Sequence, residues 1–345
     1  MTQSNLVEYG LDKNPFPLEP DMTVKFWAGR EEIKRNLLDV VESPLYTDIG
    51  GSEFVVLHGS LGAGKSHALR YLTGQINDAR QDHYHGHAIY LRTAKVAQKV
   101  SFVEIYKHLI QELGRPKIKE VASQLKEKLE TSRSLIREEN TPAGAAPGFA
   151  PDAGFVDTIL FDGFHEQDRL MIRILETVAT ETDSNALAYL FGESKSISSV
   201  TGAPVIDSDF QAVRTFGAFL RTLTTPIMNQ GPVWNAAYLF IDEVETLLDE
   251  RPADLTAFFH SIRELVNELP YGFCLLMAYT AQTALLEAMI PEAVQERFTR
   301  QYIELPALES GEAKEFIAKQ MSEFRPESFE NTNKFHPFTA EAVDV

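Results

Sequence analysis

Residues 59–66 have the types and spacing of a phosphate-binding loop, since Gly-Ser-Leu-Gly-Ala-Gly-Lys-Ser matches the pattern G-x-x-x-x-G-K-[ST] in full. Glycines allow successive backbone N–H groups to face one anion, and a helix that begins here adds its positive dipole end. In such a loop the lysine reaches the β- and γ-phosphates and the serine binds Mg²⁺. The predicted nucleotide-binding residues are Gly59, Ser60, Leu61, Gly62, Ala63, Gly64, Lys65, Ser66 and His67.

A pair of acids, Asp242 and Glu243, follows the apolar run 238–241. Asp242 is predicted to hold Mg²⁺ together with Ser66, and Glu243 to orient or deprotonate an attacking water. An acidic pair would also be favourable at a helix N-terminus, which is the alternative explanation. Glu245 is expected to be a solvated helix residue. Beside a complete phosphate loop, the pair indicates hydrolysis of a nucleoside triphosphate.

These residues need strands and helices to position them. Short apolar runs predict strands over 54–58, 87–92, 236–241, 273–280 and 301–305. Apolar strands that alternate with helices are typical of a parallel sheet, so the fold class is α/β. Helical spacing and capping signals predict helices over 31–41, 65–72 (closed by Gly74), 101–114, 117–139, 165–190, 209–228, 253–269 and 310–324.

Taken together, the motifs resemble those of an AAA+ ATPase, a P-loop NTPase. The resemblance lies in the phosphate loop, the strand that ends in Asp-Glu, a strand that ends at Thr280, and Glu296-Arg297-Phe298 before the last strand. Asn14-Pro-Phe16 and Gly29-Arg30-Glu31 look like the initiator type, which includes the origin-recognition ATPases and the transposition regulator TnsC. The resemblance covers about residues 14–345.

The resemblance implies roles for further residues. Thr280 would be the first sensor of the γ-phosphate, with a strand-terminal threonine as the alternative. Arg297 would be an arginine finger for the ATP of a neighbouring subunit, with Arg300 as the fallback and a surface arginine as the alternative. Gly29 and Arg30 would lie near the adenine. The chain would then assemble into a ring or spiral of identical subunits.

The resemblance also divides the chain. Residues 1–50 would contribute to the nucleotide pocket, 51–306 would form the ATPase core, and 307–345 would begin a helical lid. From Leu91 to Phe240 the count is 149 residues, whereas a crossover needs only about a dozen, so a helical insertion is expected at about 115–235. Because residues 338–345 start a helix without a cap, we expect the parent protein to continue. The second-sensor arginine of the lid is not assigned, because its expected position lies beyond residue 345.

The charge is unevenly distributed. With 32 Lys and Arg against 50 Asp and Glu, the net charge is −18, which excludes nucleic-acid binding through bulk charge. Segment 92–137, however, holds eleven Lys and Arg and five Glu. The resemblance implies that elements after the second strand face duplex DNA, and a solvated helix face is the alternative.

Two functions remain open. The first is an ATPase that couples ATP to assembly and to DNA or a DNA-processing partner. The second is a nucleotide-gated ATPase subunit of a bacterial defence or restriction system that acts on an effector protein. A scaffold that does not hydrolyse ATP fits poorly with Glu243. The absence of a membrane-spanning run and of a signal peptide predicts a soluble, cytoplasmic protein, and a single cysteine, Cys274, excludes an intramolecular disulfide. The histidines at 83, 85 and 87 are interpreted as a polar loop that enters a strand, with a metal site as the alternative.

Overall fold

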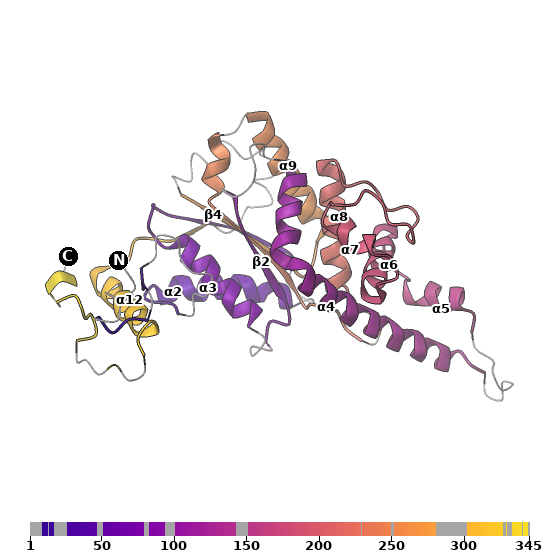
Figure 1. Cartoon of the computed structure of the whole chain (residues 1–345), viewed down its shortest axis with the longest axis horizontal. Helices are drawn as coiled ribbons and strands as arrows, with labels where there is room; N and C mark the ends of the chain where they lie inside the picture. The colour runs from indigo at the N-terminus through magenta and orange to yellow at the C-terminus, as the bar shows by residue number, and fades with distance from the viewer. Residues whose placement is uncertain are drawn as a thin grey trace.

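A parallel β-sheet of five strands lies at the centre of the computed structural model, in the order β2-β3-β4-β1-β5 (Figure 1). Every neighbouring pair of strands is parallel, as expected for apolar strands separated by helices. Each predicted strand is present, and its ends differ from the prediction by no more than one residue. The strands are β1 (Glu53–His58), β2 (His87–Arg92), β3 (Ala237–Asp242), β4 (Phe273–Tyr279) and β5 (Tyr302–Glu304).

Among the helices described, none is both long and apolar enough to cross a lipid bilayer. The structure describes residues 9–12, 14–16, 26–46, 51–78, 83–93, 101–142, 151–228, 230–249, 252–280, 302–326, 329, 333–339 and 341–343.

The two faces of the sheet are covered by different helices. Side chains such as Val55 and Leu57 pack with α2 and α3, whereas alternate side chains such as Val56 and Leu239 pack with α4, α8 and α9. This alternation follows from the two-residue period of a strand and buries both faces. The helices are α2 (Glu31–Glu42), α3 (Lys65–Asn77), α4 (Phe102–Glu139), α5 (Ala153–Leu160), α6 (Glu166–Thr180), α7 (Asn185–Leu190), α8 (Asp209–Thr224), α9 (Pro252–Glu268) and α12 (Ser310–Glu323), with 3₁₀ turns η1 (Ser43–Leu45), η3 (Val244–Asp249) and η4 (Glu341–Val343).

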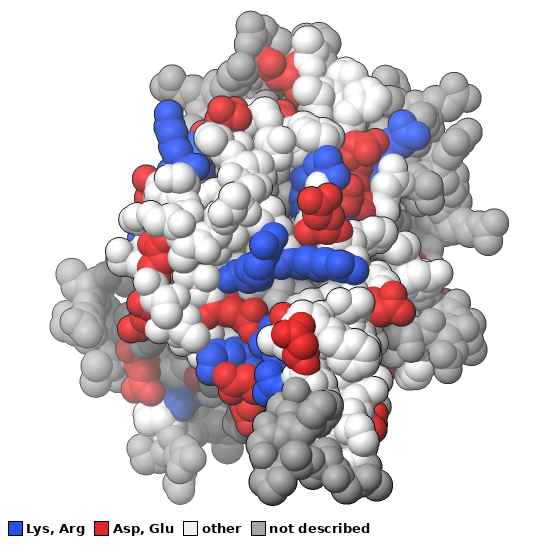
Figure 2. Space-filling view, turned by 90° about the vertical axis from the view of Figure 1, so that its right-hand side faces the viewer, with Lys and Arg blue, Asp and Glu red and all other residues white. Residues whose placement is uncertain are grey.

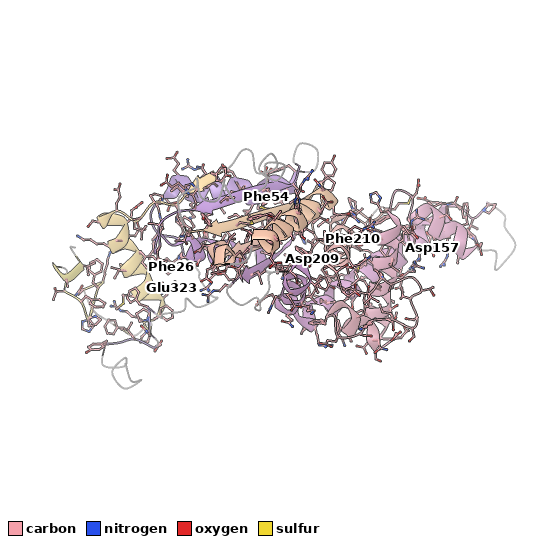
Figure 3. All side chains as sticks on the ribbon, turned by 90° about the horizontal axis from the view of Figure 1, so that it is seen from above. Phe26, Phe54, Asp157, Asp209, Phe210 and Glu323 are labelled. Atoms are coloured by element: carbon pink, nitrogen blue, oxygen red, sulfur yellow. The ribbon has the colours of Figure 1, made fainter. Side chains whose placement is uncertain are left out.

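Helices α4 to α8 stand between β2 and β3 in the chain and form an arm at one end of the sheet. Helix α4 carries this arm outward, and Asp157 marks α5 near its far end, whereas α12 lies at the opposite end of the molecule (Figures 1 and 3). Gly114 interrupts α4 with φ 73° and ψ 155°, so the two predicted helices meet there at a kink. The arm shares one apolar cluster with the sheet, as the burial of Tyr106 and Phe216 illustrates.

Some predicted helix ends are wrong. Gly74 does not close α3, which continues to Asn77 because Ile76 still faces the apolar interior. The helix predicted to reach 228 ends at Thr224, and the segment 165–190 is divided into α6 and α7 by Glu181, whose φ is 51°.

Candidate functional site

The phosphate loop connects β1 to α3, as the sequence predicts. Gly62 and Gly64 have φ values of 79° and 95°, which place them in the left-handed region that glycine adopts without strain. A Cβ atom at Gly59 would lie 2.3 Å from the carbonyl oxygen of Leu305, so only glycine fits beside the residue that follows β5. Because α3 begins at Lys65, its N-terminal amides and dipole face the loop.

Lys65 lies within the loop and is only 7% exposed. Its Nζ donates hydrogen bonds to the carbonyl oxygens of Gly59 at 2.9 Å and Ser60 at 3.0 Å. Burial lowers the pKa of Lys65, and the carboxylates of Glu245 and Asp242 act in the opposite direction. The loop therefore holds the ammonium group of Lys65, partly removed from water, at the position where phosphates would bind.

Asp242 ends β3 and is 2% exposed. Both of its carboxylate oxygens have donors: Oδ1 accepts the backbone N–H of Glu243 at 2.9 Å, and Oδ2 accepts the hydroxyl of Tyr90 at 2.5 Å. Burial, followed by the charge of Asp242, raises the pKa of Tyr90, so the phenol stays protonated and donates. Asp242 is thus a buried acid in a fixed orientation on the same side of the sheet as α3.

Glu243 is held by Arg92, a residue that sequence reasoning did not select. The Nη2 of Arg92 donates to Oε1 of Glu243 at 2.5 Å, and this hydrogen bond raises the pKa of Arg92. Glu243 Oε2 is buried and has no hydrogen-bond partner within the described part of the chain. The φ of Glu243 is 60°, a conformation that costs a non-glycine residue roughly 1–3 kcal/mol and is common at functional sites.

Glu245 is not the solvated helix residue that was expected. It is half-buried in η3, and its Oε2 accepts the backbone N–H of Thr280 at 3.1 Å. Of the two carboxylates that act on the pKa of Lys65, Glu245 has the larger effect. The bond also brings Thr280, directly after β4, to the end of β3. An acid in the turn that follows the strand ending in Asp-Glu is the signal that could have identified Glu245.

His67 joins the phosphate-loop helix to neighbouring segments. Its Nε2 lies 3.1 Å from the carbonyl oxygen of Phe26, and its ring meets Phe26 and Phe316 edge-on, at centroid distances of 5.6 Å and 5.4 Å. Burial lowers the pKa of His67, which favours the neutral ring. Figure 3 places Phe26 at the same end of the molecule as Glu323 of α12. Ser66, one residue earlier on α3, is half-buried.

Gly29 and Arg30 pack between the phosphate loop and α12. Nη1 of Arg30 donates to the carbonyl oxygens of Ala63 at 2.7 Å and Pro306 at 2.9 Å, and its backbone N–H donates to Oε1 of Glu312 at 2.6 Å. A Cβ at Gly29 would lie 2.7 Å from the Glu312 side chain, and the φ of Gly29 is 63°. The structure thus brings this pair to the loop itself. Arg297 and Arg300 lie outside the described residues, so the arginine finger stays a prediction.

Many cations of segment 92–137 are paired with acids from elsewhere in the chain. Figure 2, which views the end of the molecule where the arm lies, shows blue and red side chains interleaved among wide uncharged areas. Lys95 and Lys99 lie outside the described residues. The local excess of positive charge in the sequence is therefore largely compensated in space. The pairs made outside the segment are Arg92–Glu243, Arg115–Glu193, Lys119–Glu181, Arg133–Asp157 and Arg133–Glu176.

The residues present suit ATP with Mg²⁺. The glycine cradle, the helix N-terminus and Lys65 supply donors and positive charge for phosphates. Ser66 and Asp242 supply the oxygen ligands that Mg²⁺ prefers, and the orphaned Oε2 of Glu243 is an acceptor for which the described residues provide no donor. Within the described residues, no group of three or more His, Cys, Asp or Glu forms a separate metal site, the histidines at 83, 85 and 87 included.

The comparisons with known proteins find likeness only among solved structures. No family model matches the chain, and no curated protein does. Solved structures that match include the ORC2 protein of Aeropyrum pernix as ADPNP-ADP complexes (TM-score 0.47, 13% identity, 89% of this chain and 55% of that chain). Two others are the ORC1 protein of Aeropyrum pernix in complex with DNA (0.41, 12%, 89% and 53%) and Cdc6p of Pyrobaculum aerophilum (0.40, 12%, 91% and 54%). This chain spans about half the length of those proteins. Its own strand, phosphate loop and helix, on a five-stranded parallel sheet, give it the fold of a P-loop NTPase.

Proposed function

We propose that this chain binds ATP with Mg²⁺ at the phosphate loop and hydrolyses it. The observation that carries the proposal is that Lys65, at the N-terminus of α3, lies near enough to Asp242 and Glu245 for both carboxylates to act on its pKa, at the carboxyl edge of one parallel sheet where Glu243 follows β3. Ligands of open α/β sheets bind at this edge. The amides of α3 and Lys65 would bind the β- and γ-phosphates, and Ser66 and Asp242 would hold Mg²⁺. Bound Mg²⁺ supplies positive charge that offsets the negative charge of the phosphates.

Glu243 would be the base that orients and deprotonates the attacking water. In the structure its Oε1 accepts from Arg92 at 2.5 Å, and its Oε2 is buried. The carboxylate must therefore turn or leave Arg92 before it contacts water at the phosphates. Arg92 would thus set how readily the base is available.

Replacement of Lys65 by alanine tests the nucleotide site. We expect Lys65→Ala to lose most of its affinity for ATP, because the lysine is the cation placed at the β- and γ-phosphates. The measurement is titration with a fluorescent ATP analogue. Lys126→Ala is the matched control, since Lys126 makes an exposed pair with Glu130 on α4 and should bind like the wild type. An unchanged dissociation constant for Lys65→Ala would remove the basis of the proposal.

We further propose that the active form is a ring or spiral of identical subunits, in which Arg297 reaches the ATP of its neighbour. Arg297→Ala should then keep its affinity for ATP while turnover falls about 10³-fold, the lower end for loss of a finger. A one-to-one mixture with Lys65→Ala should recover activity, because one variant supplies the arginine and the other the intact loop. A mixture no more active than the mean of its components would exclude a shared site if Arg300→Ala behaves in the same way.

The partner that ATP controls is either duplex DNA or a protein. DNA has the support of segment 92–137, and the pairing of that segment with acids favours a protein effector, the second candidate. Steady-state ATPase measured with and without duplex DNA, at low and at moderate salt, separates the two. Stimulation that falls steeply as salt increases indicates DNA, whereas its absence indicates an effector protein, as in the defence-system alternative. Location in the cytoplasm is part of the same proposal.

A further inference from the structure

Tyr90 connects the edge strand of the sheet to the acid that ends the next strand. It belongs to β2 and is 5% exposed, and its hydroxyl donates to Oδ2 of Asp242 on β3 at 2.5 Å. The guanidinium carbon of Arg70, on α3, lies 5.2 Å from the centre of the Tyr90 ring. The ring is therefore held by a cation–π contact on its face, while its hydroxyl is held by the carboxylate.

We propose that Tyr90 is a positioning residue for Mg²⁺: it fixes the carboxylate of Asp242 in the orientation that the ion requires. The inference rests on the proposed ATPase function and adds a residue to its metal site. Tyr90 would not contact nucleotide or metal itself.

Hydrogen bonds to both oxygens leave the Asp242 carboxylate little freedom to rotate. Oδ1 accepts the backbone N–H of Glu243 at 2.9 Å, so without the phenol only that bond would fix the group. Mg²⁺ demands near-ideal octahedral geometry, and a rotating ligand satisfies it poorly. Loss of a residue that orients a metal ligand typically weakens metal binding or activity by about 10–100-fold.

Arg70 also connects Tyr90 to the helix that carries Ser66. Arg70 and Ser66 lie on the same helix, α3, so the helix that carries one proposed Mg²⁺ ligand also holds the phenol that orients the other. A ligand on α3 and a ligand on β3 are thereby kept in a fixed relation. Mg²⁺ needs this relation because its two protein ligands come from different elements.

Tyr238 provides a matched control on the same sheet. It lies on β3, is 1% exposed, and its hydroxyl has no hydrogen-bond partner in the part of the chain that the structure describes. Tyr238→Phe therefore removes a buried hydroxyl from the same apolar layer without touching Asp242. Phenylalanine fills the same volume at either position, and the thermal unfolding midpoint of each variant reports whether folding is preserved.

The experiment measures the affinity for ADP and for a non-hydrolysable ATP analogue, in Mg²⁺ and in EDTA, by calorimetric titration. We expect Tyr90→Phe to bind like the wild type in EDTA but to lose about 10-fold or more of the enhancement that Mg²⁺ gives. Tyr238→Phe should keep the full enhancement. An enhancement unchanged in Tyr90→Phe, equal losses in both media, or no enhancement in the wild type would each overturn the inference.

A double-mutant cycle tests whether Tyr90 acts through Asp242. In an Asp242→Asn background, the change Tyr90→Phe should alter the response to Mg²⁺ by less than twofold, because the group that it orients is gone. A full independent loss there would mean that Tyr90 acts elsewhere. Lys65→Ala distinguishes failure of the positioning role from failure of the nucleotide site. If Lys65→Ala loses nucleotide affinity while Tyr90→Phe keeps the full Mg²⁺ enhancement, only the positioning role is rejected. If Lys65→Ala binds nucleotide as the wild type does, the nucleotide site itself is rejected.

Discussion

The three acids at the end of β3, Asp242, Glu243 and Glu245, have different hydrogen-bond partners, and these partners distinguish the roles that we propose for them. Asp242 is buried and fixed, which suits a metal ligand. Glu243 is paired with Arg92 and has one buried oxygen without a donor among the described residues, which suits a base that must be released before it acts. Glu245 accepts the backbone N–H of Thr280 and so ties the ends of β3 and β4 together.

Replacement of Glu243 by glutamine tests its role as the base. The amide keeps an oxygen for Arg92 but cannot accept a proton from water, so ATP should bind normally while kcat falls about 100-fold or more. Single-turnover hydrolysis and analogue titration measure the two steps separately. Glu130→Gln, on the exposed face of α4, is the control and should leave kcat unchanged. Normal kcat in Glu243→Gln would mean that another group activates the water.

At the scale of elements, β2 is the strand on which the site depends, although it lies at the edge of the sheet. It carries Tyr90 and Arg92, two residues apart and therefore on one side of the strand. The free edge is protected by Asn77, whose side-chain amide donates to the carbonyl of Ala88 and accepts its N–H, both at 2.8 Å. This contact requires the last turn of α3, beyond Gly74, which the sequence did not predict. Such protection prevents a free edge from pairing with another chain.

The first residue of β2 makes stability depend on pH. The His87 ring stacks on Trp234 with a centroid distance of 5.3 Å, and burial, followed by the charge of Lys117, lowers the pKa of His87 to about 4. The unfolded chain binds the proton near pH 6.5. Because the folded chain keeps the His87 ring neutral, burial of this ring contributes its full share to the free energy of unfolding above pH 6.5. This contribution is lost as the pH falls towards 4, by up to about 3 kcal/mol.

Urea unfolding of the wild type and of His87→Phe at several pH values between 7 and 4.5 measures this contribution. The variant keeps a ring against Trp234 but cannot be protonated, so its stability should fall less over this range. His260→Gln, at an exposed position of α9, is the control. Equal slopes for wild type and His87→Phe would contradict the assignment.

At the scale of the whole molecule, a mostly buried arginine connects the arm to α9, in addition to the apolar cluster that the arm shares with the sheet. The Nε of Arg221, on α8, donates to both carboxylate oxygens of Asp168, on α6, at 2.8 Å and 2.9 Å. Nη1 of the same guanidinium donates to Oε2 of Glu268, on α9, at 2.7 Å. Because α9 packs on the sheet, these ion pairs connect the arm to the layer that covers one face of the sheet.

Loss of this arginine should destabilise the chain strongly. Arg221→Met leaves the buried carboxylate of Asp168 unpaired, which typically costs about 3–5 kcal/mol, whereas the double variant Arg221→Met/Asp168→Leu should recover most of the loss. The free energy of unfolding in urea measures both. Arg137→Met, on an exposed position of α4, is the control. A single variant as stable as the control would show that the arm is held by its apolar contacts alone.

The sequence by itself determined the strands, the parallel sheet and the phosphate loop, together with Lys65 and the acids at 242 and 243. These depend on local patterns: apolar runs bounded by turns, and glycines at fixed spacing before a helix. Such patterns are written in consecutive residues, so the chain reveals them without a fold.

Only the tertiary structure decided which partners these residues have. Tyr90 and Arg92 lie about 150 positions before the acids that they bind, and this contact follows from the pairing of β2 with β3. In the same way, Arg115, Lys119 and Arg133 of segment 92–137 meet acids from α5, α6 and the turns after α6 and α7, so much of a local excess of charge is compensated in space. Hydrogen bonds and ion pairs depend on distance between atoms, and the separation of two residues along the chain does not fix that distance.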